Sequence, residues 1–356
     1  MTVFSAPAFD GHEQLSFCCD QDSGLNAIIA IHDTTLGPAV GGCRMFPYAS
    51  DEAALDDVLR LSRGMTYKSA LAGLPLGGGK SVIIGDPRRH KRPELLRAMA
   101  RFIDGHAGRY VAAEDSGTTV DDLTLMANHT RHVSGIAQTE HGGDPSPSTA
   151  RGVFVAIGAA LAHRLGSADL HDARVAVQGL GHVGFALAAM LRDAGAQVFA
   201  ADVNPENVQR AEDELGVCAV TPDEVLALDA DILAPCAMGG VLNAASIPLL
   251  RTGIVAGAAN NQLATSEDGG RLADRGILYC PDFLINAGGI VDIHYQRSIA
   301  GRSGLLAHID TIAERLLEVL RRADSCHGPT QMIAEALARE LIDAARAAPS
   351  PALRVA

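Results

Sequence analysis

Two lysines in one short, glycine-rich stretch are the first candidates for a catalytic role. Lys68 and Lys80 lie in Gly64–Val82, GMTYKSALAGLPLGGGKSV, where three glycines (77–79) directly precede Lys80. Glycine has no Cβ, so such a run could let the backbone approach a ligand closely. A lysine supplies charge for an anionic group and, when buried, a base. The alternative is a glycine-rich surface loop with two solvated lysines, and the rest of the chain must decide between them.

A carboxylate follows further along the chain, at the expected end of a strand. Residues 110–113 (YVAA) suit a β-strand, and Glu114 and Asp115 come directly after it, before a Ser-Gly turn. Strand ends and the loops that follow them often carry the chemistry of α/β proteins. Asp115 is therefore a candidate site residue, although a carboxylate that only caps a turn or a helix would look the same.

The stretch 174–202 contains a dinucleotide-binding motif in its full context. A short apolar strand at 175–177 precedes a helix, and the glycines of G-x-G-x-x-G stand between them: Gly179, Gly181 and Gly184. These glycines allow a tight turn, backbone approach to a pyrophosphate, and close packing of helix on strand. The pyrophosphate would lie on the helix N-terminus, where free N–H groups favour an anion.

The acidic residue that completes this motif indicates which dinucleotide binds. The helix runs through Leu191, and a second strand, Gln197–Ala201, ends at Asp202. A carboxylate at this place suits the ribose hydroxyls of NAD and would repel the 2′-phosphate of NADP. No arginine follows closely in VNPENVQ. We therefore predict NAD as the cofactor.

The elements that position these residues are predicted to form two α/β domains. Ser50 is a plausible N-cap for the first helix, and Gly64 is expected to end it. Helices are expected at 51–63, 93–107, 151–165, 305–323 and 329–347. Further strands are expected at 27–31, 231–234, 253–256 and 277–280.

The domain boundaries follow from this order of elements. Residues 1–140 are predicted to form an α/β substrate and oligomerisation domain, and residues 150–325 a Rossmann-type, doubly wound NAD-binding domain. The Gly-, Pro- and Ser-rich stretch His141–Ala150 is the predicted hinge. The last helix, at about 329–356, is expected to pack back on the first domain, because the dinucleotide domain is already complete without it.

Composition narrows the classes of partner. The chain has 356 residues and a net charge of −13, which argues against nucleic acid and anionic membranes as partners. No signal peptide and no bilayer-spanning apolar stretch is evident. The seven cysteines form no C-x-x-C pair, and the 13 histidines have no ligand spacing with them. We therefore expect free thiols in the cytoplasm and no metal site.

Several stretches together resemble the amino-acid dehydrogenase family of glutamate, leucine, valine and phenylalanine dehydrogenases. The similarity runs from His12 to the last helix. It is carried by IHDTTLGPAVGG, GMTYKSALAGLPLGGGKSVI, AAEDSGTTVDD, VQGLGHVG, AGAANNQL and PDFLINAGGI. It implies two domains with a cleft that closes over the substrate, and a homo-oligomer built from dimers. The leucine and phenylalanine types are the most similar.

The resemblance also implies roles for individual residues. Lys68 would hold the substrate α-carboxylate with help from Asn261. Lys80 would be the catalytic lysine, and Asp115 would pass protons to and from the substrate nitrogen. Thr149 would contact the nicotinamide carboxamide. The other implied cofactor contacts are Gly179, Gly181, His182, Val183, Gly184, Asp202, Cys236, Ala237 and Asn260, with Cys236 expected to pack rather than react.

Oxidative deamination requires such a set of groups. A hydride moves from Cα to NAD, and water then attacks the iminium carbon. One cation must fix the carboxylate, and a base must act near neutral pH. Desolvation and a second nearby cation both favour the neutral amine of a lysine. Lys68, Lys80 and Asp115 therefore form a coherent set, which favours the functional interpretation of the lysines.

The side-chain pocket should decide the substrate. By resemblance to the leucine enzymes its wall comprises Val40, Ala113, Ile290 and Ile293, with Gly41 beside them. These residues are small or aliphatic, so a glutamate side chain would leave a buried carboxylate unpaired. Leucine, valine or isoleucine is the first choice and phenylalanine the second, since glycine is typical of phenylalanine enzymes where Ala113 stands. His294 is expected to be structural.

Two other classes of protein remain open. A 2-hydroxy-acid dehydrogenase would share the dinucleotide motif but would be expected to use a His and an Arg instead of Lys68 and Lys80. A non-catalytic NAD(H)-sensing module would bind NADH without turning over a 2-oxo acid. A requirement for ammonium during NADH oxidation separates an amino-acid dehydrogenase from both.

Overall fold

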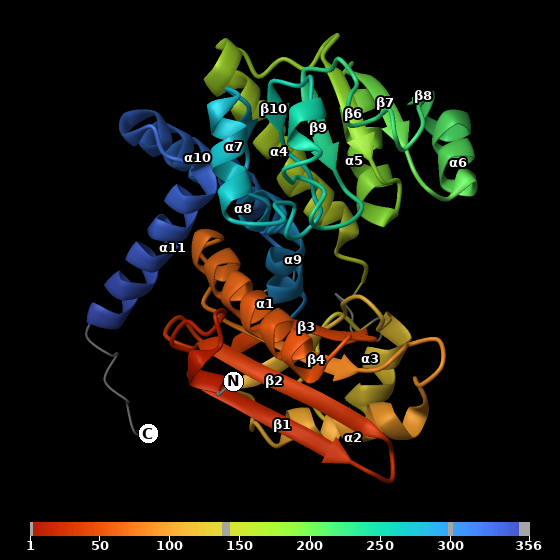
Figure 1. Cartoon of the computed structure of the whole chain (residues 1–356), viewed down its shortest axis with the longest axis vertical. Coiled ribbons are helices and arrows are strands. Elements are labelled where there is room, and N and C mark those ends of the chain that lie inside the picture. Colours follow the sequence, from red (N-terminus) through yellow and green to blue (C-terminus); the bar gives the residue numbers. More distant parts are fainter. Residues whose placement is uncertain (1–2, 137–142, 298–301, 349–356) are drawn as a thin grey trace. The chain divides into compact units, whose positions relative to one another are not determined.

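The computed structural model describes residues 3–136, 143–297 and 302–348, and these form two compact units. Unit 1 draws on residues 1–143, 296–301 and 338–356, and unit 2 on 144–295 and 302–337. Each unit consists of a β-sheet with helices, as the sequence predicts (Figure 1). His141 and Gly142 of the predicted hinge lie outside the described residues.

Unit 1 is built on a mixed sheet with the strand order β1-β2-β4-β3-β5. Its strands are β1 (Gln14–Asp20), β2 (Leu25–Asp33), β3 (Ala39–Phe46), β4 (Gly77–Ile84) and β5 (Tyr110–Ala113). The strands β1, β2 and β4 pair antiparallel, whereas β4, β3 and β5 pair parallel. The carboxyl ends of β3, β4 and β5 therefore lie at one edge of the sheet, where α/β folds place their sites.

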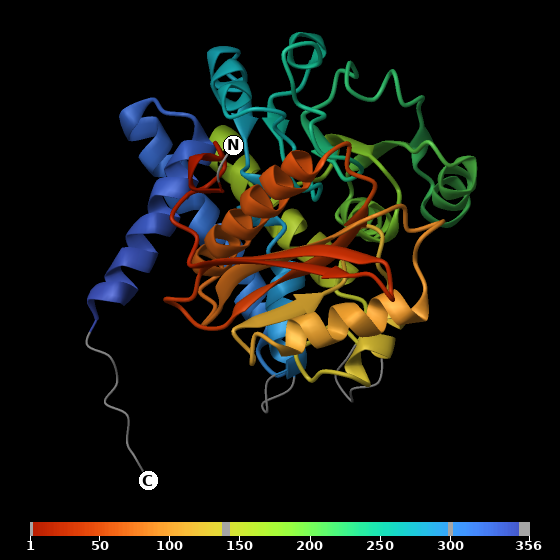
Figure 2. The same ribbon diagram turned by 60° about the horizontal axis from the view of Figure 1, so that its bottom comes forward.

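Helices cover both faces of this sheet because its strands are apolar on both sides. They are α1 (Asp51–Leu71), α2 (Pro93–Asp104) and α3 (Val120–Ala127), with a 3-10 turn, η1, at Val3–Ser5. Ile28, Ala30 and Val82 pack against Ala54 and Val58 of α1. The alternate residues of β2 and β4 point to the opposite face, where α2 and α3 complete the larger core (Figure 2).

Unit 2 is a doubly wound, parallel sheet. Its strands are β6 (Arg174–Gln178), β7 (Gln197–Ala201), β8 (Cys218–Ala219), β9 (Ile232–Pro235), β10 (Ile254–Val255) and β11 (Leu278–Tyr279). The order is β11-β10-β9-β6-β7-β8, and every pairing is parallel. Read from β8, this is the 3-2-1-4-5-6 order of dinucleotide-binding sheets, which confirms the predicted Rossmann-type fold.

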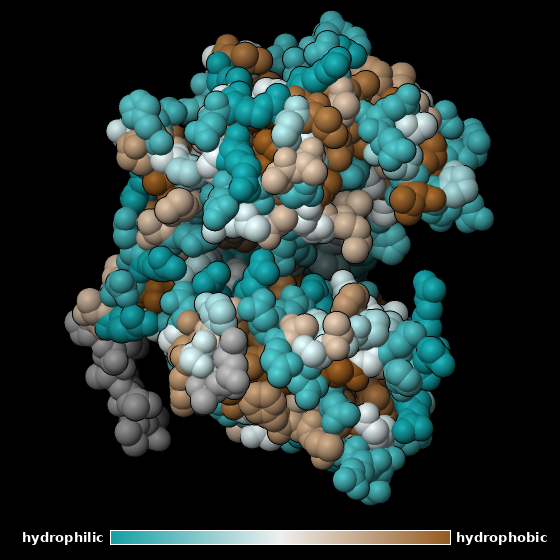
Figure 3. All heavy atoms as spheres, viewed as in Figure 1, coloured by the Kyte–Doolittle hydropathy of each residue, from teal (hydrophilic) through white to brown (hydrophobic). Residues whose placement is uncertain are grey.

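The remaining helices belong mostly to unit 2. They are α4 (Ser146–Leu165), α5 (His182–Asp193), α6 (Pro205–Leu215), η2 (Ile247–Leu249), α7 (Glu267–Asp274), α8 (Asp282–Ile285), α9 (Gly288–Arg297), α10 (Leu305–Cys326) and α11 (Thr330–Ala347). No helix in the described ranges is long and apolar enough to cross a membrane. On the face in Figure 3, hydrophilic side chains are interspersed with smaller hydrophobic groups.

The predicted end of the first helix is wrong. Helix α1 continues through Gly64 to Leu71, because the residues beyond Gly64, including Thr66 and Tyr67, bury their side chains. Gly64 costs the helix roughly 1 kcal/mol relative to alanine, which this burial outweighs. The helix ends instead before Gly73, whose φ of 65° is the left-handed conformation typical of a helix stop.

Two other predicted boundaries also move. Helix α4 begins at Ser146, so residues 146–150 of the predicted hinge are helical, with Ser146-Pro147 supplying the proline that suits a first turn. Helix α2 ends at Asp104 instead of Ala107. There, Ala107 and Gly108 both take positive φ angles, which a helix cannot accommodate.

Candidate functional site

The structure brings Lys80 and Asp115 together in unit 1. Lys80 lies on β4 with its side chain only 8% exposed, and its Nζ forms an ion pair with Oδ2 of Asp115. The Asp115 side chain is 14% exposed and follows the end of β5, where the sequence places it. The surface-loop alternative is therefore wrong for Lys80, which is part of a buried strand.

The three glycines before Lys80 pack against the protein itself, which corrects the expectation that they admit a ligand. A Cβ on Gly79 would lie 2.7 Å from the ring of Tyr110, and one on Gly77 would collide with the carbonyl oxygen of Asp33. A Cβ on Gly78 would lie 2.5 Å from the Cα of Thr66 on α1. Glycine is thus required because α1 and β4 approach closely.

That close approach also places the second lysine. Lys68 lies in the last turn of α1, two residues after Thr66, and Lys80 lies two residues after Gly78. Lys68 is half-buried and follows Met65 by three residues, and the Cγ of Met65 lies 3.3 Å from the Cβ position of Gly41 on β3, so Lys68 shares the helix face that packs on the sheet.

Strand alternation adds the predicted pocket residues to the same face of the sheet. Gly78 faces α1, and Val40 is its partner on β3. Ala113 of β5 pairs with Gly42 of β3, whose Cβ position is 2.6 Å from the Cβ of Asp115. Val40 and Ala113 are both buried. The face therefore combines an aliphatic wall with a buried ion pair.

A third cation, which sequence reasoning missed, lies beside the pair. The Nε of Arg44 is 3.5 Å from Oδ2 of Asp115, and its Nη1 is 2.9 Å from Oδ2 of Asp57. Burial alone would raise the pKa of Asp115, but the Lys80 ammonium and the Arg44 guanidinium outweigh it and lower the pKa. The available signal was strand alternation, because Arg44 follows Gly42 by two residues and so shares its face.

Unit 2 carries the dinucleotide motif in the expected geometry. A Cβ on Gly184 would collide with the carbonyl oxygen of Gly179, so this glycine permits close packing of helix on strand. Gly181 has nothing within 4 Å of its Cβ position and is the N-cap of α5, with no side chain capping the helix. Open space beside free N–H groups fits a bound pyrophosphate.

The acidic residue of the motif is fixed beside that turn. Asp202 follows β7, and its Oδ2 accepts a hydrogen bond from the backbone N–H of Leu180 at 2.7 Å. His182 and Val183 begin α5, and the side chain of His182 is 83% exposed. These positions fit a dinucleotide that lies across the turn with its ribose near Asp202.

Helix α9 approaches the start of α4 through two glycines. A Cβ on Gly289 would lie 2.6 Å from Oγ1 of Thr149, and one on Gly288 would meet the carbonyl oxygen of Ser148. Ile290 on α9 is buried, and Ile293 is half-buried. The contact therefore places the predicted nicotinamide residue next to the helix that carries two predicted pocket residues. His294 stacks edge-on against Tyr295 on this helix.

The asparagine pair Asn260-Asn261 is held by its neighbours. Asn261 has a φ of 52°, in the left-handed region that asparagine tolerates, and its N–H donates to Oδ2 of Asp282 at 2.7 Å. Oδ1 of Asn260 accepts from Nδ2 of Asn286 at 3.0 Å. Both side chains of the pair reach the surface of unit 2, whereas Asn286, which the sequence analysis missed, is buried.

Cys236 and Ala237 lie after β9, against the glycine turn. The Cβ position of Gly179 is 2.8 Å from the Cβ of Ala237, and that of Gly184 is 3.2 Å from the Cβ of Cys236. Burial raises the pKa of the Cys236 thiol to about 12. This thiol therefore stays protonated and packs, as the sequence analysis expects.

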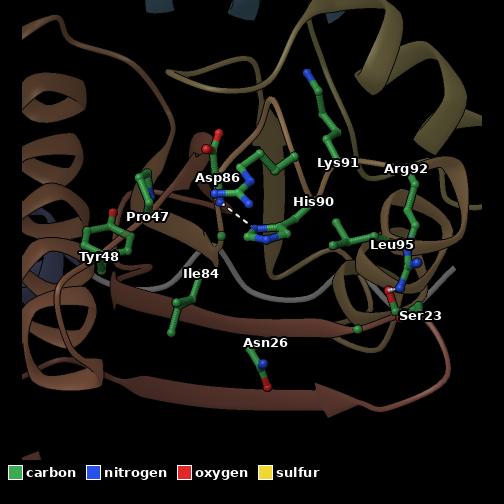
Figure 4. Close-up of a pocket in the computed structure, with 13 residues that line it drawn as sticks. Ser23, Asn26, Pro47, Tyr48, Ile84, Asp86, His90, Lys91, Arg92 and Leu95 are labelled. Atoms are coloured by element: carbon green, nitrogen blue, oxygen red, sulfur yellow. Dashed lines mark hydrogen bonds between the residues drawn. The ribbon is translucent and has the colours of Figure 1, made fainter.

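A pocket of about 570 Å³ in unit 1 contains none of the predicted site residues. Figure 4 shows His90 near its centre, with Lys91 pointing away and Arg92 pointing towards Ser23. Lys91 Nζ is 2.7 Å from Asp122, and Arg92 Nη2 donates to the carbonyl oxygen of Ser23 at 3.1 Å. These two cations are thus already engaged within the fold.

Known families match both units. Residues 12–132 match the Glu/Leu/Phe/Val dehydrogenase dimerisation domain, and residues 206–346 match the glutamate/leucine/phenylalanine/valine dehydrogenase family. Residues 123–239 match the NAD-binding domain of D-isomer specific 2-hydroxyacid dehydrogenases. The last match covers the part of the chain that contains the dinucleotide motif.

Individual relatives are similar over nearly the full length. A leucine dehydrogenase from Geobacillus stearothermophilus is 46% identical over 355 residues, which covers 99% of this chain and 97% of the relative. A phenylalanine dehydrogenase from Bacillus thermotolerans is 46% identical over 319 residues, with 88% and 84% covered. The crystal structure of L-tryptophan dehydrogenase from Nostoc punctiforme is 42% identical, with a TM-score of 0.81 and 94% and 97% covered.

Proposed function

The chain belongs to the Glu/Leu/Phe/Val dehydrogenase family and is an amino-acid dehydrogenase, and we propose that it acts on an apolar L-amino acid, with leucine, valine or isoleucine preferred. The reaction converts the amino acid, NAD and water to the 2-oxo acid, ammonia and NADH, and runs in reverse as reductive amination. The observation that carries this proposal is the buried Lys80–Asp115 ion pair on the sheet face that also presents Val40 and Ala113.

Each charged residue has a part in the proposed mechanism. Lys68 holds the α-carboxylate, with Asn261 as a second contact, so that Cα is oriented for hydride transfer. NAD, when bound, accepts that hydride. Lys80 removes a proton from the water that attacks the iminium carbon, and Asp115 delivers a proton to the departing amine. Their ion pair supports this division of roles, because a proton can pass between two side chains in direct contact.

We propose that the cofactor is NAD instead of NADP. The carboxylate of Asp202 stands after β7 and is fixed by the backbone N–H groups of Leu180 and Asn204, each at 2.7 Å. A 2′-phosphate placed here would meet a negative charge. The next residue, Val203, is exposed and offers no cation in compensation.

Aliphatic residues at the predicted pocket positions of each unit support a branched-chain substrate, and an aromatic amino acid is the second candidate. Val40 and Ala113 in unit 1 and Ile290 and Ile293 in unit 2 carry no polar group that could hold a second carboxylate. The relatives include phenylalanine and tryptophan dehydrogenases, which favours an aromatic substrate as the alternative. A non-catalytic NAD(H)-sensing module is the alternative outside enzymes.

The substrate test compares kcat/KM for four 2-oxo acids with ammonium and NADH. We expect 4-methyl-2-oxopentanoate and 3-methyl-2-oxobutanoate to exceed phenylpyruvate, and 2-oxoglutarate to be the poorest. A clear preference for phenylpyruvate would move the assignment to an aromatic amino acid. Turnover of 2-oxoglutarate at the best rate would contradict the aliphatic pocket.

We also propose a cytoplasmic homo-oligomer. All seven cysteines lie in the described part of the chain and carry free thiols, which suits a reducing compartment. The match to a dimerisation domain supports self-association through unit 1. Size-exclusion chromatography with light scattering would contradict this part of the proposal if the enzyme were a monomer at micromolar concentration.

A further inference from the structure

Arg44 lies between two carboxylates in unit 1. Its side chain is 20% exposed, with Nη1 2.9 Å from Oδ2 of Asp57 and Nε 3.5 Å from Oδ2 of Asp115. Among the described residues its buried Nε has no hydrogen-bond partner. This donor therefore lies next to Asp115 without forming a hydrogen bond to it.

The elements around Arg44 hold it in that place. Gly42 and Arg44 share a face of β3, and the absent Cβ of Gly42 leaves room for the side chain of Asp115. Asp57 on α1 also accepts a hydrogen bond from the hydroxyl of Tyr48 at 2.5 Å. Arg44 is thus oriented by a helix carboxylate that is itself fixed.

The charges around Asp115 come from two strands. Lys80 reaches it from β4 and Arg44 from β3. Cys43 and Tyr110 also lie near, but burial raises the pKa of Cys43 to about 12 and that of Tyr110 well above its ordinary value, so both are neutral at physiological pH. Lys80 and Arg44 are therefore cations that directly stabilise the Asp115 carboxylate.

These two cations are not equivalent during a reaction. A lysine that acts as a base must spend part of the cycle as a neutral amine, and it then no longer stabilises the carboxylate beside it. An arginine keeps its charge throughout, because its guanidinium does not deprotonate in proteins. Asp115 therefore needs a permanent cation whenever Lys80 has given up its proton.

We propose that Arg44 is a positioning residue that keeps Asp115 directed at Lys80 and favours its ionised form, so that Asp115 returns to the carboxylate after each proton that it passes to the substrate nitrogen. The inference rests on the proposed roles of Lys80 and Asp115. It assigns to Arg44 the control of the acid side of the pH profile.

The test compares the pH dependence of kcat/KM for the amino acid in four proteins. Arg44→Met should lower kcat at least ~10-fold and move the acid limb upwards by about one pH unit or more, because a nearby opposite charge favours the ionised carboxylate. Arg44→Lys should restore at least half of that movement. Arg60→Met is the matched control, since Arg60 is a half-exposed arginine on α1 paired with Asp56, and it should match the wild type.

A fifth protein, Asp57→Asn, should shift the acid limb of the pH profile in the opposite direction. Asp57→Asn keeps Arg44 and removes the carboxylate that competes for it, so the acid limb should move to lower pH. Loss of structure alone would change rates without moving the limbs in opposite directions. Acid limbs that stay in place in both Arg44→Met and Asp57→Asn would overturn the proposal.

A measurement without turnover separates this inference from the proposed function. Aspartate labelled with ¹³C at Cγ reports the titration of Asp115, and Asp115→Asn identifies its signal. The midpoint should lie at higher pH in Arg44→Met than in the wild type, and an unchanged midpoint would refute the role of Arg44. An inactive wild-type enzyme would refute the proposed function, while this titration would still decide the question of Arg44.

Discussion

A methyl group added at Gly78 should push apart the helix that carries Lys68 and the strand that carries Lys80. The added Cβ would lie 2.1 Å from the backbone N of Thr66, whereas ordinary contact begins at 3.4 Å, so α1 and β4 must separate by about 1.3 Å (3.4 − 2.1). Overpacking of this kind costs roughly 1–3 kcal/mol. A displacement near 1 Å can lower a rate by about 100-fold.

Gly78→Ala is therefore expected to lower the free energy of unfolding by about 1–3 kcal/mol and kcat/KM by about 100-fold. Unfolding can be followed by circular dichroism, since the chain has no tryptophan. Gly64→Ala is the matched control: this glycine is inside α1 with nothing within 4 Å of its Cβ position. Alanine there should stabilise the protein by roughly 0.5–1 kcal/mol without loss of activity.

A Gly78→Ala variant with the free energy of unfolding and the kcat/KM of the wild type would contradict this prediction. Such a result would mean that the contact between α1 and β4 is loose, and that the placement of the two lysines does not depend on it.

Three further substitutions or conditions test other parts of the structure. Burial and the neighbouring His32 lower the pKa of His12 to about 4, so the neutral ring stabilises the fold above its unfolded value near ~6.5, and this is lost as the pH falls towards 4. Chemical denaturation should show that the free energy of unfolding falls by roughly 2–3 kcal/mol between pH 7 and 4, after allowance for solvent screening. The fall should be smaller in His12→Gln, and an equal dependence of the free energy of unfolding on pH in both proteins would contradict this prediction. Lys80→Ala should reduce turnover by ~1,000-fold or more while NADH binding, measured by cofactor fluorescence, stays within about twofold; a near-normal rate would exclude Lys80 as the base. Asp202→Ala should raise the NADPH/NADH ratio of kcat/KM by at least ~10-fold, and an unchanged ratio would remove Asp202 from the choice of cofactor.

The sequence predicted the parts of the fold that depend on local pattern. The strand at Tyr110–Ala113 and the strand at Gln197–Ala201 have the predicted bounds, because each is a short apolar run with clear breaks on both sides. The glycine motif was predictable for the same reason, since its strand, turn and helix are adjacent in the chain. Asp115 and Asp202 followed from their place directly after such strands.

The features that the sequence did not predict depend on contacts between segments that are far apart in the chain. Gly77–Gly79 were interpreted as room for a ligand, whereas the space that they leave is filled by Thr66, Tyr110 and the backbone at Asp33. No local sequence pattern indicates these contacts. Arg44 was missed because its partners lie on α1 and after β5, and only the pairing of β3 with its neighbours brings them together.

The proposed reaction can be tested by the ammonium dependence of NADH oxidation with 4-methyl-2-oxopentanoate, followed by identification of the product. The proposed reductive amination predicts a rate that requires ammonium and saturates with it, and leucine as the product. Equal oxidation without ammonium, with the 2-hydroxy acid as product, would contradict the roles of Lys68, Lys80 and Asp115. That result would indicate that the similarity to 2-hydroxyacid dehydrogenases, found over residues 123–239, extends to the reaction itself.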